Sequence, residues 1–597
     1  VIYTSKQINK MNLTIKLNLI FLVVFLISIK AIAQRDTINT DKLIIVKQYS
    51  PTVNDAFKIK QKPSEKDSIK QVRRELSYSF IDVPVASTFT PAKGTASGVR
   101  MSPPDKLFEN YSRFGVGNFS TILADFYSNF DINRDRNLDI AFNHISSQGG
   151  IDGVVLDDDF SNTNVRLDLT SQDRYFDWNS GFDINRREVN YYGLGSKQVD
   201  ALIQDQLKAI DSKQTYTKLE AFGGIRFTDL VLKEAELTVY NFTDNFSSSE
   251  QLLTIQPVLD IPLRTQKLSI KGDFKFLNGS FEEGLIGGES LDYQQFQAGI
   301  NPFMKFNIQN VNLKLGAKAV YFNDLENSEN KVFFYPDIKA EFSLNQEGIN
   351  VFLGANGGLE QNTFENLSQQ NPFLSPTQLI RPSNNQYNAF VGFTTKILEN
   401  LSLSSQVNYS STNNFAFFIA NPEIDYANGH SKRGFDYQNS FGVVYTDLKT
   451  FGVSADLAYQ IDSDFNVGLF GKYSDFSTDN GQPAWNLPEI ELRAYADFDF
   501  TKNWNFSAAL FYIGERTDAQ GTIFIDSNSI PISGGQINTT EVEGYLDLNA
   551  SLEYKINPRL AVFVNGNNLL NNSYNRWQNF EVQGIQVLGG LTYQFNW

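Results

Sequence analysis

The chain has 597 residues, a net charge of −16 and no cysteine. The lack of cysteine excludes disulfides, a lipid anchor on cysteine, thiolate metal sites and a cysteine nucleophile. The negative charge argues against nucleic acid as a partner, because phosphate binding requires clustered Lys and Arg. A mean hydropathy of −0.30 argues against a helical membrane protein, whereas 50 Phe and 26 Tyr are typical of β-strands and of the aromatic girdles of membrane barrels.

Residues 1–33 predict a non-structural start followed by a secretory signal peptide. Met11 is the expected true start, and it is followed by Lys16 and an apolar run over 17–29. Ala31 and Ala33 are the two small residues of a cleavage site that ends before Gln34. The run is shorter than the roughly 18 apolar residues that a membrane helix needs, and no later stretch reaches that length. A membrane-spanning form of this chain would therefore have to use strands.

Residues 34–111 differ in composition from the rest of the chain, since they are rich in proline and hold the densest Lys and Arg. This composition fits a mobile periplasmic tail and equally a segment that folds back into the lumen of a barrel. We therefore divide the mature chain into an N-terminal periplasmic or lumen-inserting segment over 34–111 and a barrel over 112–597.

From Arg113 onward the sequence repeats one alternating theme. It is clearest in Ile585–Trp597, where every second residue is apolar, aromatic or glycine and the residues between are mostly small or polar. Because side chains alternate across a strand, this stretch predicts a closing strand with one lipid-facing row that ends on Phe595 and Trp597. The same period recurs around residues 138–143, 165–169, 268–276 and 311–319.

The predicted strands are joined by links of two alternating classes. Tight turns alternate with longer polar links, which is typical of a transmembrane barrel with its short turns in the periplasm and its long loops outside the cell. The sequence thus predicts an all-β fold, a transmembrane antiparallel β-barrel of about 22 strands with both termini in the periplasm. The turns are expected at 133–136, 264–266, 309–310, 347–348, 399–400, 462–464, 501–503 and 557–558, and the long links near 148–161, 195–214, 281–291, 323–331, 363–384, 417–435, 478–486, 515–541 and 573–584.

Four stretches carry a resemblance to a known family. They are Asn568–Tyr574, placed in the penultimate strand, Val582–Leu591 before an aromatic terminus, and, more loosely, Ala484–Pro488 and Tyr512–Thr517. In these stretches the chain resembles the TonB-dependent receptors of the outer membrane, in the form seen in Bacteroidetes. The resemblance implies an outer-membrane barrel and a C-terminal aromatic signal read by the barrel-assembly machinery.

The N-terminal interval departs from that family. Its members place a globular plug between signal and barrel, usually longer than the interval 34–111, which also lacks the glycine-rich, mixed helix and strand character of a plug. The only candidate for a TonB-binding motif is Leu43–Val46. We therefore expect a reduced plug, with the lumen filled by the N-terminal segment, by inward-folded loops or by a partner protein.

No stretch carries a recognisable catalytic, cofactor or metal motif, and we predict that the protein is not an enzyme. His144 lies on a predicted strand and His430 in a long link, and two such residues are too few for a triad or a zinc site. Asp157–Asp159 offers carboxylates to a hard cation, but a solvated loop tip explains it better.

Two further groups of residues have open roles. The apolar spacing over Val199–Ile210 predicts one amphipathic helix, which would cap the barrel mouth, meet a partner or pack within its loop. Mixed charges are expected along the lumen, as in any large barrel, and they do not indicate a substrate class. These charges are Lys271, Lys275, Lys314 and Lys318 together with Asp183, Glu220 and Asp273.

The leading functional hypothesis is an outer-membrane barrel of the TonB-dependent-receptor type that passes or takes up a solute, with doubtful energy coupling because the plug is reduced. The alternative is a non-transporting scaffold or accessory barrel in an outer-membrane complex for assembly, secretion or capture of a surface lipoprotein. Expected partners are outer-membrane lipid and lipopolysaccharide, the barrel-assembly machinery during biogenesis, and TonB or a periplasmic or surface protein.

Overall fold

A computed structural model describes residues 108–195, 199–200, 202, 204–282, 290–344, 348–423, 432–461, 464–520, 524–525, 531–532 and 538–597. The expected signal peptide, the candidate TonB-binding motif and nearly all of the segment 34–111 lie outside these residues. Neither described helix is long and apolar enough to cross a membrane.

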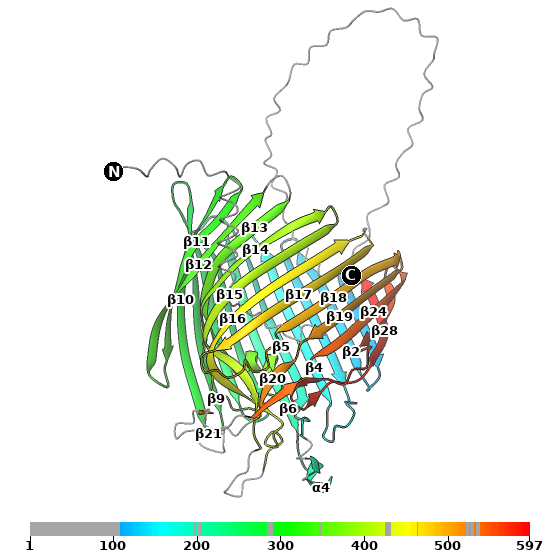
Figure 1. The fold of residues 1–597 in the computed structure, drawn as a ribbon. Helices are drawn as coiled ribbons and strands as arrows, with labels where there is room; N and C mark the ends of the chain where they lie inside the picture. Colours follow the sequence, from blue (N-terminus) through cyan, green and yellow to red (C-terminus); the bar gives the residue numbers. More distant parts are fainter. Residues whose placement is uncertain are drawn as a thin grey trace, which may run out of the picture.

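The chain forms a closed antiparallel β-barrel of 22 strands (Figure 1). The predicted fold class and strand number are therefore confirmed. Each strand pairs with its neighbours in chain order, and the last strand pairs with the first. The strands are β1 (Asn110–Gly117), β2 (Ile122–Asn133), β3 (Arg136–Ser147), β4 (Phe160–Gln172), β5 (Phe176–Asn190), β6 (Lys213–Phe227), β7 (Leu232–Asp244), β8 (Ser249–Pro262), β9 (Lys267–Phe281), β10 (Leu291–Ile308), β11 (Val311–Asp324), β12 (Glu329–Leu344), β13 (Ile349–Glu360), β14 (Ser383–Leu398), β15 (Leu401–Ala420), β16 (Phe441–Gln460), β17 (Phe465–Thr478), β18 (Ile490–Thr501), β19 (Trp504–Ile513), β24 (Tyr545–Asn557), β25 (Leu560–Asn567) and β28 (Gln586–Phe595).

Smaller elements lie in the links between barrel strands. The link from β19 to β24 contains the hairpin of β20 (Arg516–Gln520) and β23 (Asn538–Val542), together with β21 (Phe524–Ile525) and β22 (Pro531–Ile532). The link from β25 to β28 contains β26 (Asn575–Trp577) and β27 (Phe580–Glu581). Two short helices, α4 (Gln204–Leu207) and α5 (Phe364–Gln370), lie in the β5–β6 and β13–β14 links.

The two faces of each strand differ as the sequence alternation predicts. Phe334 on β12 is 78% exposed on the outside of the barrel, and Leu591 on β28 is likewise exposed. The next residues along these strands, Tyr335 and Thr592, point the other way and are buried. The outer surface is therefore an apolar belt, and the inner face holds most of the charged and amide side chains.

The two ends of the barrel differ in the length of the links between strands. One end, here called the turn end, carries connections such as 134–135, 309–310 and 502–503, and the other, the loop end, carries the long links. Three loop-end links, 118–121, 245–248 and 325–328, are nevertheless as short as turns. The C-terminus lies at the turn end (Figure 1).

The placement of Asn568–Tyr574 within the penultimate strand is wrong, because β25 ends at Asn567. The motif forms the first turn of the link that follows. Asn568 adopts a φ of 47°, a left-handed conformation that asparagine tolerates. Its side chain donates to the carbonyl oxygens of Asn572 and Gln583, at 2.9 and 3.0 Å. The asparagines are thus explained by a tight turn and not by strand pairing.

The seam between β1 and β28 closes the barrel. Their register runs from Asn110 opposite Phe595 to Gly117 opposite Leu588. On the lumen side the Phe563 ring lies directly over Gly590, where a Cβ atom would come within 2.5 Å of it. The Arg113 guanidinium then covers that ring at 4.1 Å.

Trp597 covers the outer side of this seam at the turn end. Its Nε1 donates to the hydroxyl of Ser128 at 2.9 Å, and that hydroxyl donates to Asn110 Oδ1 at 2.6 Å. The indole also stacks on Phe130, with ring centroids 5.3 Å apart. The last residue of the chain therefore ties β28 to β2 across β1.

We expect Trp597→Ala to lower the free energy of unfolding by about 2 kcal/mol, the sum of one hydrogen bond and one aromatic pair. Trp597→Phe keeps the stacking and loses only the hydrogen bond, so it should lose about half as much. Urea titration of the protein refolded into lipid vesicles measures both values. Wild-type stability in both variants would contradict this account of the seam.

Candidate functional site

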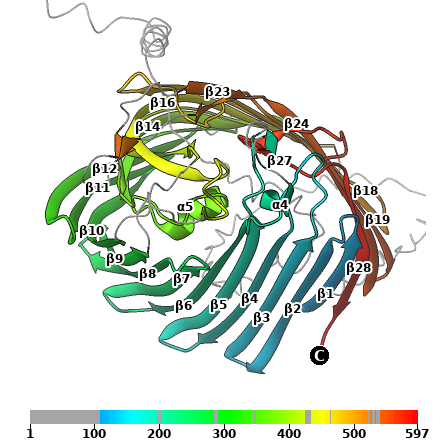
Figure 2. The same cartoon turned by 90° about the horizontal axis from the view of Figure 1, so that it is seen from below.

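The β13–β14 link, residues 361–382, folds into the barrel interior and is here called the lumen loop. Viewed from the loop end, its helix α5 lies inside the ring of strands (Figure 2). It reaches from its own strands to side chains of β5, β6, β8 and β10. Because these strands lie several positions away around the ring, the loop extends across the lumen.

The start of α5 is held by two separate devices. Thr363 and Asn366 form a capping box, in which each side chain accepts from the other residue's backbone amide at 3.0 Å. The carboxylate of Glu250 on β8 then accepts from the amides of Phe364 and Glu365, at 2.6 and 3.1 Å. A carboxylate at a helix N-terminus satisfies orphan donors and complements the helix dipole.

Glu250 is fully buried, so its charge must be met by donors. Besides the two amides, Tyr240 donates to Oε1 at 3.0 Å and Tyr293 donates to Oε2 at 2.8 Å. One carboxylate therefore joins three wall strands to the lumen loop.

The other end of α5 meets a cation. Arg187 Nη2 on β5 donates to the carbonyl and the hydroxyl of Ser368, at 2.9 and 3.0 Å. A positive group near the last carbonyls complements the negative end of the helix. Lys218 on β6 adds an ion pair to Glu365 at 3.4 Å. The short helix is thus held at both ends by charges from the barrel wall.

Aromatic side chains surround the lumen loop and form what we call the cap cluster. Phe364 on α5 packs against the rings of Tyr216, Phe242 and Phe281. On the other side of the loop, the members come from β15, β16 and the loop-end links. The cluster consists of Tyr191, Tyr216, Tyr240, Phe242, Leu277, Phe281, Tyr293, Phe364, Leu367, Phe373, Leu374, Ile380, Phe418, Ala420, Phe435, Phe441, Val443 and Phe580.

The second half of the lumen loop is bonded to β16. The amide of Phe441 donates to the carbonyl of Phe373 at 3.0 Å, and the amide of Ser375 donates to the carbonyl of Phe441 at 2.8 Å. The side chain of Gln378 bridges further, accepting from the Val443 amide at 2.8 Å. The loop is therefore fastened to both sides of the lumen by backbone hydrogen bonds and side-chain contacts.

Tyr191 links the lumen loop to the base of the β5–β6 link. Its hydroxyl donates to the Leu374 carbonyl at 2.7 Å. Burial, with smaller contributions from Tyr216 and Asp244, raises the pKa of Tyr191 well above its usual range. The phenol therefore remains a donor at any physiological pH.

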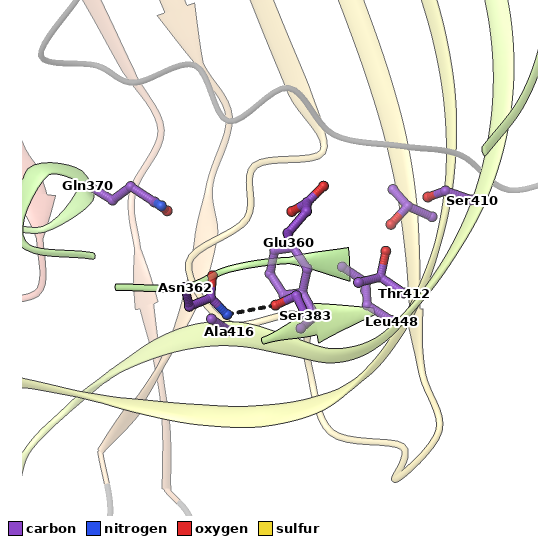
Figure 3. Close-up of a pocket in the computed structure, with 10 residues that line it drawn as sticks. Glu360, Asn362, Gln370, Ser383, Ser410, Thr412, Ala416 and Leu448 are labelled. Carbon is purple, nitrogen blue, oxygen red and sulfur yellow. Dashed lines mark hydrogen bonds between the residues drawn. The ribbon is translucent and has the colours of Figure 1, made fainter. Parts of the chain in front are cut away.

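A polar pocket of about 90 Å³ lies between the lumen loop and β14 to β16 (Figure 3). Asn362 and Ser383 are hydrogen-bonded to each other at 2.9 Å along one side, and Glu360 and Thr412 face the same space. Sites for whole ligands are several times larger, about 300 Å³ or more, so this pocket fits one hydroxylated or amide group of a larger molecule. It is lined by Glu360, Asn362, Gln370, Ser383, Ser410, Thr412, Phe415, Ala416, Leu448 and Thr450.

The β20–β23 hairpin docks beside β15 through a buried carboxylate. Asp518 accepts from the amides of Ala519 and Ala420, at 2.7 and 3.4 Å, while its Oδ2 has no hydrogen-bond partner among the described residues. Burial raises the pKa of Asp518 to about 7, and the hydrogen bonds and Arg516 oppose this only in part. Beside it the Asn486 amide donates to the Thr517 carbonyl at 2.8 Å. Two of the family-like stretches, 484–488 and 512–517, therefore meet in space.

The histidine and aspartate candidates do not converge on one site. His144 lies on β3, where Nδ1 contacts the hydroxyl of Thr163 at 2.7 Å and Nε2 that of Ser146 at 3.1 Å. His430 lies outside the described residues. Within the described part, no group of three or more metal-ligating side chains is found.

The aspartates at 157–159 serve the β3–β4 link itself. Asp158 Oδ2 accepts from the Ile151 amide at 2.8 Å. Asp159 accepts from Asn190 through both its carbonyl and Oδ1, at 2.8 and 2.9 Å. Two of the three carboxylates thus stabilise local structure.

The amphipathic helix expected over Val199–Ile210 is shorter than predicted. α4 ends at Leu207, and the Ile210 amide closes only a turn onto the Leu207 carbonyl at 3.3 Å. Asp205 and Gln206 are exposed. Residues 196–198, 201 and 203 lie outside the described part.

The sequence places residues 363–384 among the long outer links and does not indicate the role of Glu250. A signal was present: Phe364, Leu367, Phe373 and Leu374 form an apolar group in an otherwise polar link. Such residues need burial, and Thr363 with Asn366 marks a helix start.

No protein-family model and no curated protein matches the sequence. Solved structures do match, although their identity of 11–12% shows a shared fold alone. The FrpB iron transporter from Neisseria meningitidis (F3-3 variant) matches with a TM-score of 0.60 and 11% identity over 82% of each chain. The ferric-catecholate import receptor Fiu from E. coli K12 has a TM-score of 0.55 and 11% identity, over 82% of each chain. The copper transporter OprC has a TM-score of 0.54 and 12% identity, over 83% of this chain and 82% of that one.

These neighbours are TonB-dependent outer-membrane receptors, the class that the sequence resembles. The chain therefore shares the barrel fold of these receptors.

We expect Glu250→Ala to release the lumen loop, because it leaves two amides and two phenols buried without an acceptor, at about 1–3 kcal/mol for each unpaired group. Glu250→Gln keeps the shape and one acceptor oxygen, so it should show a smaller effect. Limited proteolysis of the folded protein, with cleavage within 361–382 identified by mass spectrometry, measures the release. A loop that stays protected in Glu250→Ala would show that the cap cluster alone holds it.

The docking of the β20–β23 hairpin should weaken as pH rises. A free aspartate loses its proton around pH 3.8, whereas docked Asp518 keeps it up to about pH 7. The docked state therefore binds more protons between these values, and its stability falls across that window. Asp518→Asn should remove the dependence. Amide hydrogen exchange over 514–520, corrected for the intrinsic effect of pH, is the measurement, and an unchanged dependence in Asp518→Asn would assign it to another group.

Proposed function

We propose that the protein is an outer-membrane β-barrel of the TonB-dependent-receptor type that passes or takes up a solute. The apolar belt on the outside supports contact with outer-membrane lipid and lipopolysaccharide. The sorted links support a periplasmic turn end that carries both termini. The aromatic terminus at Phe595 and Trp597 fits recognition by the barrel-assembly machinery.

The observation that carries this proposal is the lumen loop with its polar pocket. A 22-strand barrel encloses a wide lumen. Here the lumen loop narrows that lumen at the loop end, and part of the surface along the narrowed passage is polar. The pocket beside α5 places hydroxyl, amide and carboxylate groups along the way. Such a constriction holds part of a polar solute inside the barrel.

Energy coupling is the finer part of the proposal. Two predictions depend on residues 34–107: engagement of TonB through Leu43–Val46, and the reduced plug. The Bacteroidetes type depends on the sequence resemblance. All three remain predictions, and residues 34–107 lie outside the described part.

Conductance in planar lipid bilayers tests the transport role. We expect replacement of residues 362–381 by a short glycine-serine linker to open the barrel, because the lumen loop lies inside it. Additional deletion of residues 35–105 should open it further if that segment inserts into the lumen, and should change nothing if it is a periplasmic tail. Deletion of exposed α4, residues 204–207, is the control and should leave the conductance unchanged. Each variant is first checked for folding by its heat-dependent mobility on gels. A barrel that remains closed after both lumen changes is not a conduit.

The cap cluster favours the second candidate function, a non-transporting scaffold in an outer-membrane complex. It ties the lumen loop, β16 and the loop-end links into one buried aromatic unit, which suits a fixed outer surface for a protein partner. Gentle detergent extraction separates the two functions. A scaffold copurifies with a partner in a fixed ratio, whereas a transporter is recovered as the barrel alone.

A further inference from the structure

Three lysines stand directly opposite one another on adjacent strands at the turn end of the lumen. Lys305 on β10 pairs with Lys314 on β11, and Lys314 pairs with Lys339 on β12. All three share the strand face opposite to exposed apolar residues such as Leu315 and Ile338, so they face the lumen. Like charges in direct cross-strand register destabilise a sheet, and this row contains two such pairs in succession.

Carboxylates offset only part of this repulsion. Lys314 Nζ lies 2.5 Å from Asp337, and Lys339 Nζ lies 2.7 Å from Glu341. Lys305 has no ion pair among the described residues. Lys305 Nζ lies 5.8 Å from the centroid of the Phe303 ring, and the same centroid lies 4.7 Å from Lys314 Nζ.

A second row continues the positive charge toward the loop end. Lys271 on β9 is opposite Asn301 on β10, and continuation of the β10–β11 register places Lys318 on the far side of Asn301. Neither lysine has an ion pair in the described part of the chain. Gly358 leaves room for Lys318, since a Cβ there would lie 3.2 Å from Nζ.

Carboxylates also flank this second row. Asp273 lies between Lys271 and Lys275 on β9, and its Oδ2 pairs with Lys275 Nζ at 3.2 Å. Asp273 and then Asp337 act electrostatically on Lys318, and Glu234 acts on Lys271. The six lysines therefore outnumber the carboxylates that meet them. They are Lys271, Lys275, Lys305, Lys314, Lys318 and Lys339, together called the lysine wall.

The strands across the ring carry the opposite charge. Six to eleven strand positions away, β18, β24, β2 and β3 carry lumen-facing carboxylates, with Arg113 and Arg493 among them. An excess of positive charge on one side of the ring creates a field across the lumen. The carboxylates are Asp125, Asp139, Asp497, Asp499, Asp547 and Glu553.

We propose that the lysine wall binds and guides an anionic solute with several phosphate or carboxylate groups. This deepens the proposed function, on which the guiding role rests. The side chains are lysines, which act as flexible point charges and do not require the planar, bidentate geometry that arginine provides. Successive lysines on β11 are four residues apart, roughly 13 Å along the strand. An anion is thus held weakly at several points and passed between them.

Isothermal titration calorimetry on the full chain in zwitterionic detergent tests the binding site. The probes are inorganic tripolyphosphate and citrate, which separate phosphate from carboxylate recognition. We expect at least one probe to bind, more weakly at higher salt. The triple variant K305Q/K314Q/K339Q should lose affinity on the order of tenfold, as expected for three partly exposed charges.

The matched control is K208Q/K449Q/K502Q, which removes the same charge away from the lysine wall and should keep wild-type affinity. Because the wall variant removes like-charge pairs, it should also unfold at a higher urea concentration than the wild type, so a folding failure is not expected. Equal affinity in the two triple variants, or no binding of either probe to the wild type, overturns the proposal.

Bilayer conductance separates this proposal from the transport role. If a probe binds through the lysine wall but the barrel stays closed, the binding site is supported. The proposed transport function is then overturned, and the guiding role with it. If the barrel conducts but binds neither probe, the proposed transport function is supported and the lysine-wall binding site is overturned.

Discussion

Closure of the sheet is the constraint on which the rest of this structure depends. A strand in a membrane barrel must find a neighbour on both sides, because an unpaired backbone edge has no water to bond with. The β1–β28 seam meets this demand with continuous pairing from Asn110 to Gly117. Glycines on its inner side admit the Phe563 ring, and Trp597 covers its outer side. The chain therefore ends on a residue that stabilises the joint between its first and last strands.

The second constraint is the wide interior that a 22-strand ring creates. The lumen loop fills part of this interior, because α5 and a set of aromatic rings pack together as a small core inside the barrel. Glu250 is the point where this core meets the wall, since it accepts from two helix amides and two tyrosines of separate strands. A buried carboxylate is tolerated there because each of its oxygens has two donors.

The remaining lumen is wet and unequal in charge. Water screens like charges that a dry core would not tolerate, so Lys305, Lys314 and Lys339 can share one row. The cost of that row has no structural return, because its two ion pairs, Lys314 with Asp337 and Lys339 with Glu341, could form without placing the lysines in register. A role in binding explains why six lysines gather on β9 to β12.

The sequence alone determined the class of fold, because a strand period of two and the sorting of short and long links follow from local chemistry. The alternation in Ile585–Trp597 placed the closing strand, and the turn positions led to the strand number. Local patterns failed where the result depended on distant residues. Asn568–Tyr574 was read as strand because its turn becomes visible only with Gln583 nearby, and the helix after Val199 ends early. The lumen loop, Glu250 and the lysine register were decided by tertiary structure alone, because each is made by residues that only barrel closure brings together.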